Sequence, residues 1–111
     1  MTINARNKGK RFELKIAAVW MRLFGGEVER TGYANKKLDD QGVDLTNTPP
    51  FNIQCKAHER SIDMHAILER MPIDTNYNIV IHKKNHRPPV VAMHLDDFLE
   101  MVQMMKRNGV M

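Results

Sequence analysis

Four polar residues have the types and the spacing that hydrolysis of a phosphodiester bond requires. They are Glu13, Asp44, Gln54 and Lys56. Such hydrolysis at neutral pH uses a divalent cation to polarise a phosphoryl oxygen, and hard cations such as Mg²⁺ prefer oxygen ligands. Asp44 offers a carboxylate, and Gln54 offers a side-chain carbonyl oxygen next to the backbone carbonyl of Cys55. Glu13 can reach the same ion directly or through water.

The string Phe51-Asn52-Ile53-Gln54-Cys55-Lys56 has the pattern of a strand that presents two polar side chains together. Side chains alternate between the faces of a strand, so Gln54 and Lys56 point one way while Ile53 and Cys55 point the other. Asp44 is expected on the neighbouring strand. Lys56 would then lie near a metal and a phosphate, where it can orient the attacking water or stabilise charge that develops in the transition state.

The elements that must position these residues follow from apolar periodicity and from turn residues. They are, in order, a helix over residues 4–24, strands over 27–31, 43–46 and 51–57, a helix over 62–71, strands over 77–82 and 90–94, and a helix from Leu95 that is closed by Asn108-Gly109. The first three strands are expected to form a meander, with a loop over 32–41. The order α-β-β-β-α-β-β-α predicts an α/β fold.

Length and composition favour one domain over residues 1–111, because 42% hydrophobic content in 111 residues suffices for a single core. No apolar run of about 18 residues is present, and the N-terminus lacks the apolar stretch of a signal peptide. We therefore expect no membrane association and a cytoplasmic location, in a bacterium, an archaeon or a cell infected by a virus. The lone Cys55 forms no internal disulfide.

Other ionisable residues have weaker patterns. The five histidines match no zinc motif, and His58 alone can share the strand face of Gln54 and Lys56. Asp39 and Asp40 are expected to cap a turn, although either can approach a metal from the loop.

Basic residues outnumber acidic ones by 17 to 13, which favours an anionic partner. Four of them crowd the start of the first predicted helix, where their charge opposes the helix macrodipole. Contact with DNA phosphates would explain this placement, and a solvated helix surface is the alternative. Others lie in or beside the predicted loop and can clamp a second stretch of backbone. The predicted DNA-binding residues are Arg6, Lys8, Lys10, Arg11, Arg30, Lys36 and Lys37.

Three features together resemble the PD-(D/E)XK nuclease superfamily. They are the Asn-Lys-Gly-x-x-x-Glu string at residues 7–13, the aspartate of Gly42-Val43-Asp44-Leu45 and the strand ending in Lys56. The first string resembles the opening of archaeal-type Holliday junction resolvases. The resemblance covers roughly residues 4–94, and Lys8 and Gly9 also match.

This resemblance implies a restriction-endonuclease-like αβββαβ core with a mixed central sheet flanked by helices, followed by an extra C-terminal strand and helix. It also implies a homodimeric endonuclease that uses Mg²⁺, with Mn²⁺ as a substitute, to cut DNA at four-way junctions or other branches. It assigns the catalytic centre to Glu13, Asp44, Gln54 and Lys56. The implied metal ligands are Glu13, Asp44, Gln54 and the backbone carbonyl of Cys55.

The sequence departs from the resolvase pattern at Gln54, where those enzymes usually have glutamate. The change removes one formal negative charge from the expected metal site. The string Ile-Gln-Cys-Lys instead looks like Mrr-type restriction endonucleases of the same superfamily. Three functions therefore stay open: a junction resolvase, an endonuclease of ordinary duplexes, and a structure-selective DNA-binding protein without catalysis.

The last predicted helix is more apolar than one buried face requires. Met101, Met104 and Met105 accompany Leu95 and Phe98 within it. A contact between two copies of the chain would use this surplus, because exposed apolar patches commonly mark protein interfaces.

Overall fold

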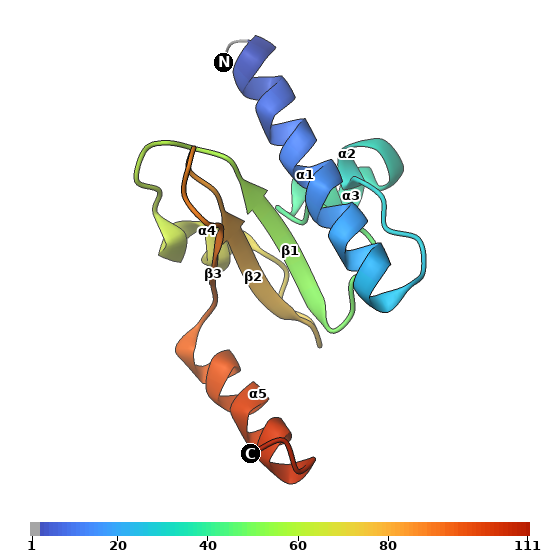
Figure 1. Cartoon of the computed structure of the whole chain (residues 1–111), viewed down its shortest axis with the longest axis vertical. Helices are drawn as coiled ribbons and strands as arrows, with labels where there is room; N and C mark the ends of the chain where they lie inside the picture. The colour runs from blue at the N-terminus through green and yellow to red at the C-terminus, as the bar shows by residue number, and fades with distance from the viewer. Residues whose placement is uncertain (1–2) are drawn as a thin grey trace.

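The structure, a computed structural model, describes residues 3–111, and its side chains from residue 5 onward; residues 1 and 2 of the expected domain lie outside the described part. Its elements are α1 (Ile3–Phe24), α2 (Thr31–Ala34), α3 (Lys36–Asp40), β1 (Phe51–Lys56), α4 (Met64–Arg70), β2 (Tyr77–His82), β3 (Val90–Ala92) and α5 (Leu95–Arg107). Helices surround a small sheet, which confirms the general α/β class (Figure 1).

The three strands form one mixed sheet in the order β1-β2-β3. β1 and β2 are parallel, with Phe51 beside Tyr77 and Lys56 beside His82. Parallel neighbours need a crossover connection, and α4 supplies it. β3 runs antiparallel to β2 and follows it through the basic segment 83–89. β1 is therefore an outer strand of this sheet, with one side open to the segment that precedes it.

The two faces of the sheet bury two apolar clusters. On the face covered by α1, Phe12 and Ala17 pack with strand residues that include the fully buried Ile53. On the opposite face, α4 contributes Ile67 and Leu68 to a cluster whose strand members and neighbours are Val43, Met71 and Val80. Burying one such side chain stabilises a fold by about 1.5–3 kcal/mol, so these clusters fix both helices on the sheet.

The predicted strands over 27–31 and 43–46 are wrong as regular strands, and so is the three-stranded meander that they would form with β1. The two segments meet in a single antiparallel bridge between Arg30 and Leu45. Backbone bonds from Thr31 N to Asp44 O and from Thr46 N to Glu29 O flank it, at 2.9 Å each. The segments keep the expected neighbours, but turns on both sides leave too little extended chain for a ladder.

The predicted loop over 32–41 is also corrected, because most of it is helical. α2 and α3 occupy it, separated by Asn35, whose side chain accepts a hydrogen bond from Leu38 N at 3.2 Å. Asparagine is a favoured residue at such an N-cap because its oxygen satisfies a free helix amide. The polar composition that predicted a loop is thus the solvent-exposed surface of two short helices.

Three other predicted boundaries shift by one or two residues. The helix predicted over 62–71 runs over 64–70, because the Asp63 side chain caps it by accepting from Ala66 N at 3.1 Å. The strand predicted over 51–57 ends at Lys56, and the one over 90–94 ends at Ala92.

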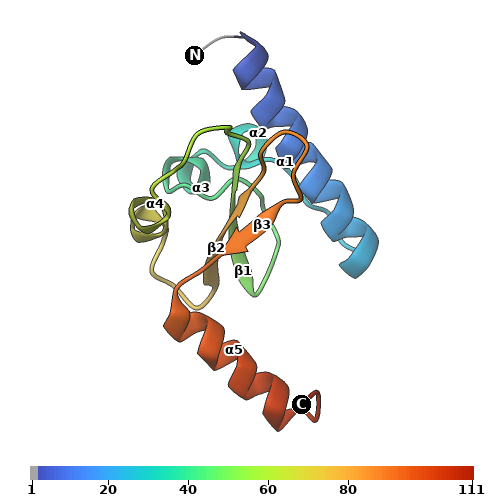
Figure 2. The same ribbon diagram turned by 60° about the vertical axis from the view of Figure 1, so that its left-hand side comes forward.

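The last helix leaves the sheet and extends away from the rest of the molecule in both views (Figures 1 and 2). The molecule measures 47 × 31 × 28 Å, and its radius of gyration of 14.4 Å exceeds the value of about 13 Å typical of compact chains of this size. Separately, no helix within residues 3–111 has the length and apolar character needed to cross a membrane.

Candidate active site

All four predicted catalytic residues line one open pocket of about 610 Å³ beside the outer edge of β1. Three parts of the chain build it: α1, the segment between Arg30 and Asp44, and β1. The lining includes Arg6, Gly9, Lys10, Glu13, Arg30, Gly32, Asp39, Asp44, Gln54, Cys55, Lys56 and His58. Residues separated by more than 40 positions in the sequence are therefore gathered as the spacing of the motifs predicts.

Asp44 is held against β1 by both its backbone and its side chain. Its N–H donates to the carbonyl of Ile53 at 2.8 Å, and its Oδ2 accepts from the N–H of Cys55 at 2.7 Å. The carboxylate thus takes the place that a backbone carbonyl would occupy in a continuing ladder. In a strand, the N–H and C=O of one residue point to the same side. The Cys55 carbonyl therefore faces the same edge.

Glu13 reaches the pocket from α1 and lies beside Arg30, with Oε2 at 3.6 Å from Nη2. The pKa of Glu13 is raised from its ordinary value of 4.5 to about 7, chiefly by burial and also by the negative charge of Asp44, whereas Arg30 opposes the rise. At neutral pH this carboxyl is therefore close to half protonated in the absence of a further cation.

Asp44 experiences a similar environment. Its pKa rises from 3.8 to about 6, because burial outweighs the hydrogen bond from Cys55 N and the charge of Lys56, both of which lower it. Burial also raises the pKa of the Cys55 thiol, and both carboxylates reinforce the effect, so this cysteine stays a neutral thiol. Two acidic groups whose charges are disfavoured by burial form the electrostatic centre of the pocket.

Gln54 and Lys56 share one face of β1, as predicted, while Ile53 and Cys55 pack on the α1 side. In the orientation that satisfies both of its groups, the Gln54 amide donates through Nε2 to Gly42 O at 3.0 Å. Its Oε1 then accepts from Lys56 Nζ at 3.2 Å. Gly42 has a φ of +79°, and a Cβ there would lie 3.1 Å from the same amide atom of Gln54 that faces Gly42 O. Glycine at this turn therefore makes room for the amide.

The donor set suits a hard divalent cation. It consists of the Glu13 and Asp44 carboxylates with the Cys55 carbonyl and, after rotation of its amide, Gln54. All are oxygen ligands, which Mg²⁺ prefers. A bound cation would stabilise both negative charges and so offset the cost of burial that raises the two pKa values. Within residues 3–111, no three His, Cys, Asp or Glu side chains are gathered closely enough to hold a metal by themselves. The amide, the backbone carbonyl or water would therefore complete the shell.

Two further residues join the four predicted ones at the centre of the pocket. Arg30, expected to clamp DNA from a loop, instead pairs with Glu13, and its buried Nε has no hydrogen-bond partner within the described residues. Asp39 lies near enough to raise the pKa of both Glu13 and Asp44. Asp39 lies on α3, and the Asn35 cap is the sequence signal that would have predicted this helix and therefore the position of Asp39.

The predicted DNA-binding residues divide into those at the pocket and those away from it. Arg6 and Lys10 line the pocket beside Glu13. Arg11 is exposed elsewhere on α1, while Lys36 pairs with Asp40 at 3.3 Å and Lys37 is exposed on α3. The basic residues of α1 are thus better placed than those of α3 to meet a substrate in the pocket.

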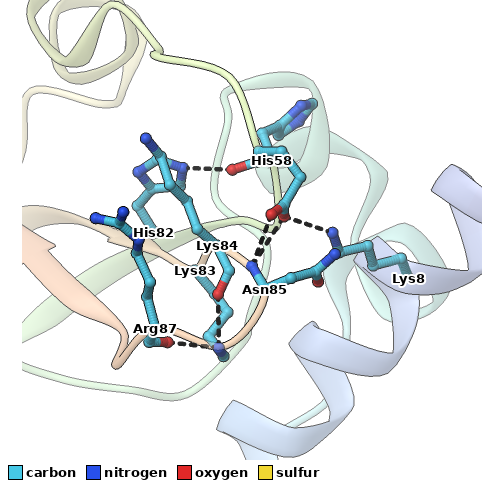
Figure 3. Close-up of polar contacts among 8 residues, drawn as sticks. Lys8, His58, His82, Lys83, Lys84, Asn85 and Arg87 are labelled. Carbon is cyan, nitrogen blue, oxygen red and sulfur yellow. Dashed lines mark hydrogen bonds and ion pairs between the residues drawn. The ribbon is translucent and has the colours of Figure 1, made fainter.

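Lys8 connects α1 to two loops (Figure 3). Its Nζ lies 2.8 Å from Glu59, whose oxygens also accept from Asn85 N at 2.8 and 2.9 Å. The hydrogen bond from Lys8 lowers the pKa of Glu59, and that from Asn85 lowers it further. The loop after β1 is also joined to β2, because the His58 carbonyl lies 2.9 Å from His82 Nε2. These contacts hold the basic segment 83–89 beside the loop that contributes His58 to the pocket.

The two raised pKa values predict how stability depends on pH. Both carboxyls bind protons more tightly in the folded chain than in the unfolded one, so between about pH 4 and pH 7 the folded state holds more protons. Raising the pH through this window in EDTA should therefore lower the free energy of unfolding, by about 2 kcal/mol after allowance for the partial solvent exposure of Glu13. Urea denaturation at about pH 5 and pH 8 measures this.

The control is the double variant Glu13→Gln with Asp44→Asn, which should lose most of this pH dependence. Adding Mg²⁺ at about pH 8 should stabilise the wild type more than the double variant. Equal pH dependence in the two proteins would show that these carboxyls are not destabilised by burial.

Comparison of the chain with protein-family models, with curated proteins and with solved structures gave no match. The function is therefore inferred from the pocket itself.

Proposed function

We propose that the chain is a magnesium-dependent DNA endonuclease that hydrolyses phosphodiester bonds, with four-way junctions or other branched DNA as its substrate. One observation carries this proposal: two carboxyls with raised pKa values lie with Lys56 in one open pocket, beside the basic start of α1. The combination suits an anionic substrate together with a divalent cation.

In this proposal Glu13, Asp44 and the Cys55 carbonyl hold Mg²⁺, with Mn²⁺ as a substitute, and Gln54 joins them by rotating its amide. When bound, the ion acts as a Lewis acid on the phosphoryl oxygen and lowers the pKa of a water molecule. Asp44 has an additional positioning role, because its bond to Cys55 N fixes the carboxylate relative to β1.

Lys56 is the proposed partner of the scissile phosphate. Released from Gln54, its ammonium group can donate to a non-bridging phosphoryl oxygen and stabilise the negative charge that grows as the water attacks. Arg30 lines the same pocket beside Glu13, where its positive charge would assist. Arg6 and Lys10 would neutralise neighbouring phosphates and so position the strand.

We further propose that the fold is a reduced form of the PD-(D/E)XK nuclease core. The order α1, β1, α4, β2 supports this interpretation, with Arg30 and Leu45 marking where two further strands would pair. As in the resemblance, the enzyme would act as a homodimer in a single-domain form. We also propose that this activity operates in the cytoplasm of a bacterial, archaeal or virus-infected cell.

The test is cleavage of a labelled four-way junction and of a linear duplex of matched sequence, each with Mg²⁺ or with EDTA. The proposal predicts cleavage that requires Mg²⁺ and prefers the junction. Preference for the duplex would select the Mrr-like alternative, which Gln54 favours. Junction binding without cleavage under Mg²⁺ or Mn²⁺ would contradict catalysis and leave a structure-selective DNA-binding protein.

A further inference from the structure

The outer face of α5 is an apolar stripe that its own chain does not cover. The stripe comprises Leu95, Phe98, Leu99, Val102 and Met105, at the three- and four-residue spacing that aligns side chains along one helix face. Leu95 is 66% exposed, Phe98 49%, Leu99 46% and Met105 41%, while Val102 is half-buried, and no residue of α5 is buried. An isolated helix of 13 residues is marginal in water, so a contact on this stripe would contribute to its stability.

A different face of α5 contacts the body of the molecule, which fixes the direction of the stripe. The Tyr77 hydroxyl donates to Glu100 Oε1 at 2.7 Å. A groove of about 280 Å³ lies between the helix and the end of the sheet, lined by Phe51 and Tyr77 on one side and by Met101, Met104 and Met105 on the other. Met105 borders both this groove and the stripe, whereas Leu95, Phe98, Leu99 and Val102 do not line the groove, so that part of the stripe remains available for a second molecule.

The charges at the two ends of α5 indicate what that molecule is. The first turn carries Asp96 and Asp97, and the last turn carries Lys106 and Arg107. Two copies of such a helix side by side in the same direction would place like charges together. In opposite directions, each acidic first turn meets a basic last turn. A membrane surface fits less well, because the polar face of α5 includes Asp96 and Glu100, which anionic lipids would repel.

We propose that α5 pairs antiparallel with α5 of a second copy of this chain, about a two-fold axis near the middle of the helix. Phe98 then packs against the partner's Val102, Leu95 packs against the partner's Met105, and Asp96 lies beside the partner's Lys106. Such an isologous contact is self-complementary, because each pairing occurs twice. Outside α5, Val90 and Val91 of β3 are also exposed, at 55% and 61%. The pairing does not depend on the proposed nuclease activity.

A charge exchange tests the pairing and its direction. Sedimentation velocity over a concentration series should show a dimer for the wild-type chain. Asp96→Lys and Lys106→Asp alone should each raise the dimer dissociation constant by about tenfold or more, because two ion pairs become two repulsions. An equimolar mixture of the two variants should restore dimers, since the lysine introduced in one variant then faces the aspartate introduced in the other. Glu27→Lys is the matched control, an exposed charge reversal away from α5 that should leave the dimer unchanged.

Each outcome decides the proposal. A wild-type chain that stays monomeric at the highest concentration overturns it, and so does a dimer that neither charge reversal weakens. Weakening without restoration in the mixture would exclude the antiparallel direction. Circular dichroism of each variant establishes that α5 still forms. Because sedimentation needs no DNA, a monomeric wild type would also contradict the proposed homodimeric enzyme, while the proposed cleavage would still be judged by its own test.

Discussion

Replacing Asp44 by asparagine is expected to lower Mg²⁺-dependent cleavage by about a thousandfold. The carboxylate is the best-fixed oxygen ligand of the pocket, and a cation at a phosphoryl centre is worth several kcal/mol of transition-state stabilisation. Asparagine removes the negative charge but keeps an oxygen that can accept from Cys55 N. Single-turnover cleavage of the junction with saturating enzyme measures the chemical step without the contribution of DNA affinity.

The matched control is Glu27→Gln, which also turns a carboxylate into an amide but lies exposed outside the pocket. It should cleave like the wild type. Asp44→Ala should lose cleavage too, yet it should also be less stable than Asp44→Asn by about 1–3 kcal/mol, because the Cys55 amide loses its acceptor. Near-normal cleavage by a folded Asp44→Asn protein would exclude this residue from the catalytic centre.

Replacing Lys56 by methionine is expected to lower the rate of cleavage by about a hundredfold or more, with a much smaller effect on DNA affinity. Methionine keeps much of the length of the side chain and removes the charge that would face the phosphate. Loss of one donor aimed at developing negative charge typically costs a factor of about 10²–10³ in rate. Single-turnover rates and equilibrium binding to the junction, measured separately, distinguish the two effects.

Lys15→Met provides the control, since Lys15 is an exposed lysine of α1 outside the pocket. It should leave the single-turnover rate unchanged. Removing the Lys56 charge should also raise the pKa of Asp44, because that charge lowers it in the wild type. If Lys56→Met weakened junction binding and left the single-turnover rate intact, Lys56 would be a DNA-binding residue rather than a catalytic one.

The helices and strands that were predicted correctly have either a long apolar pattern or clear turn residues at their ends. α1 follows from apolar periodicity before Gly25-Gly26, and β1 and β2 follow from apolar stretches bounded by turn residues. α5 was predicted from its start at Leu95 to its closure at Asn108. In each case many consecutive residues favour the same secondary structure, and the tertiary contacts are compatible with that local preference.

The segment between α1 and β1 was mispredicted because side chains decide its structure. The Thr31 hydroxyl donates to the Val43 carbonyl, and the Asp44 carboxylate accepts from Cys55 N, where a regular sheet would use backbone groups. Alternation of apolar residues over four or five positions cannot reveal that a side chain will take the place of a backbone hydrogen-bonding group. The Asn35 cap likewise turns an apparently polar loop into helix.

The same distinction applies to the candidate site. The structure brings Glu13, Asp44, Gln54 and Lys56 to one pocket, as the order and spacing of the sequence motifs led us to expect. The ion pair between Glu13 and Arg30, and the approach of Asp39, depend on how the intervening segment folds. No local pattern in the sequence specifies those contacts. The catalytic role of the pocket stays a prediction that the cleavage tests decide.

The bond between the Asp44 carboxylate and Cys55 N has a consequence for the solubility of the protein. An outer strand with free amides is a template on which strands of other molecules can add, which leads to aggregation. Asp44 occupies that position with a negative charge, so it also repels an incoming acidic chain. Substitutions at Asp44 that cannot accept this bond would then shorten the lifetime of the protein in concentrated solution, whether or not any DNA is present.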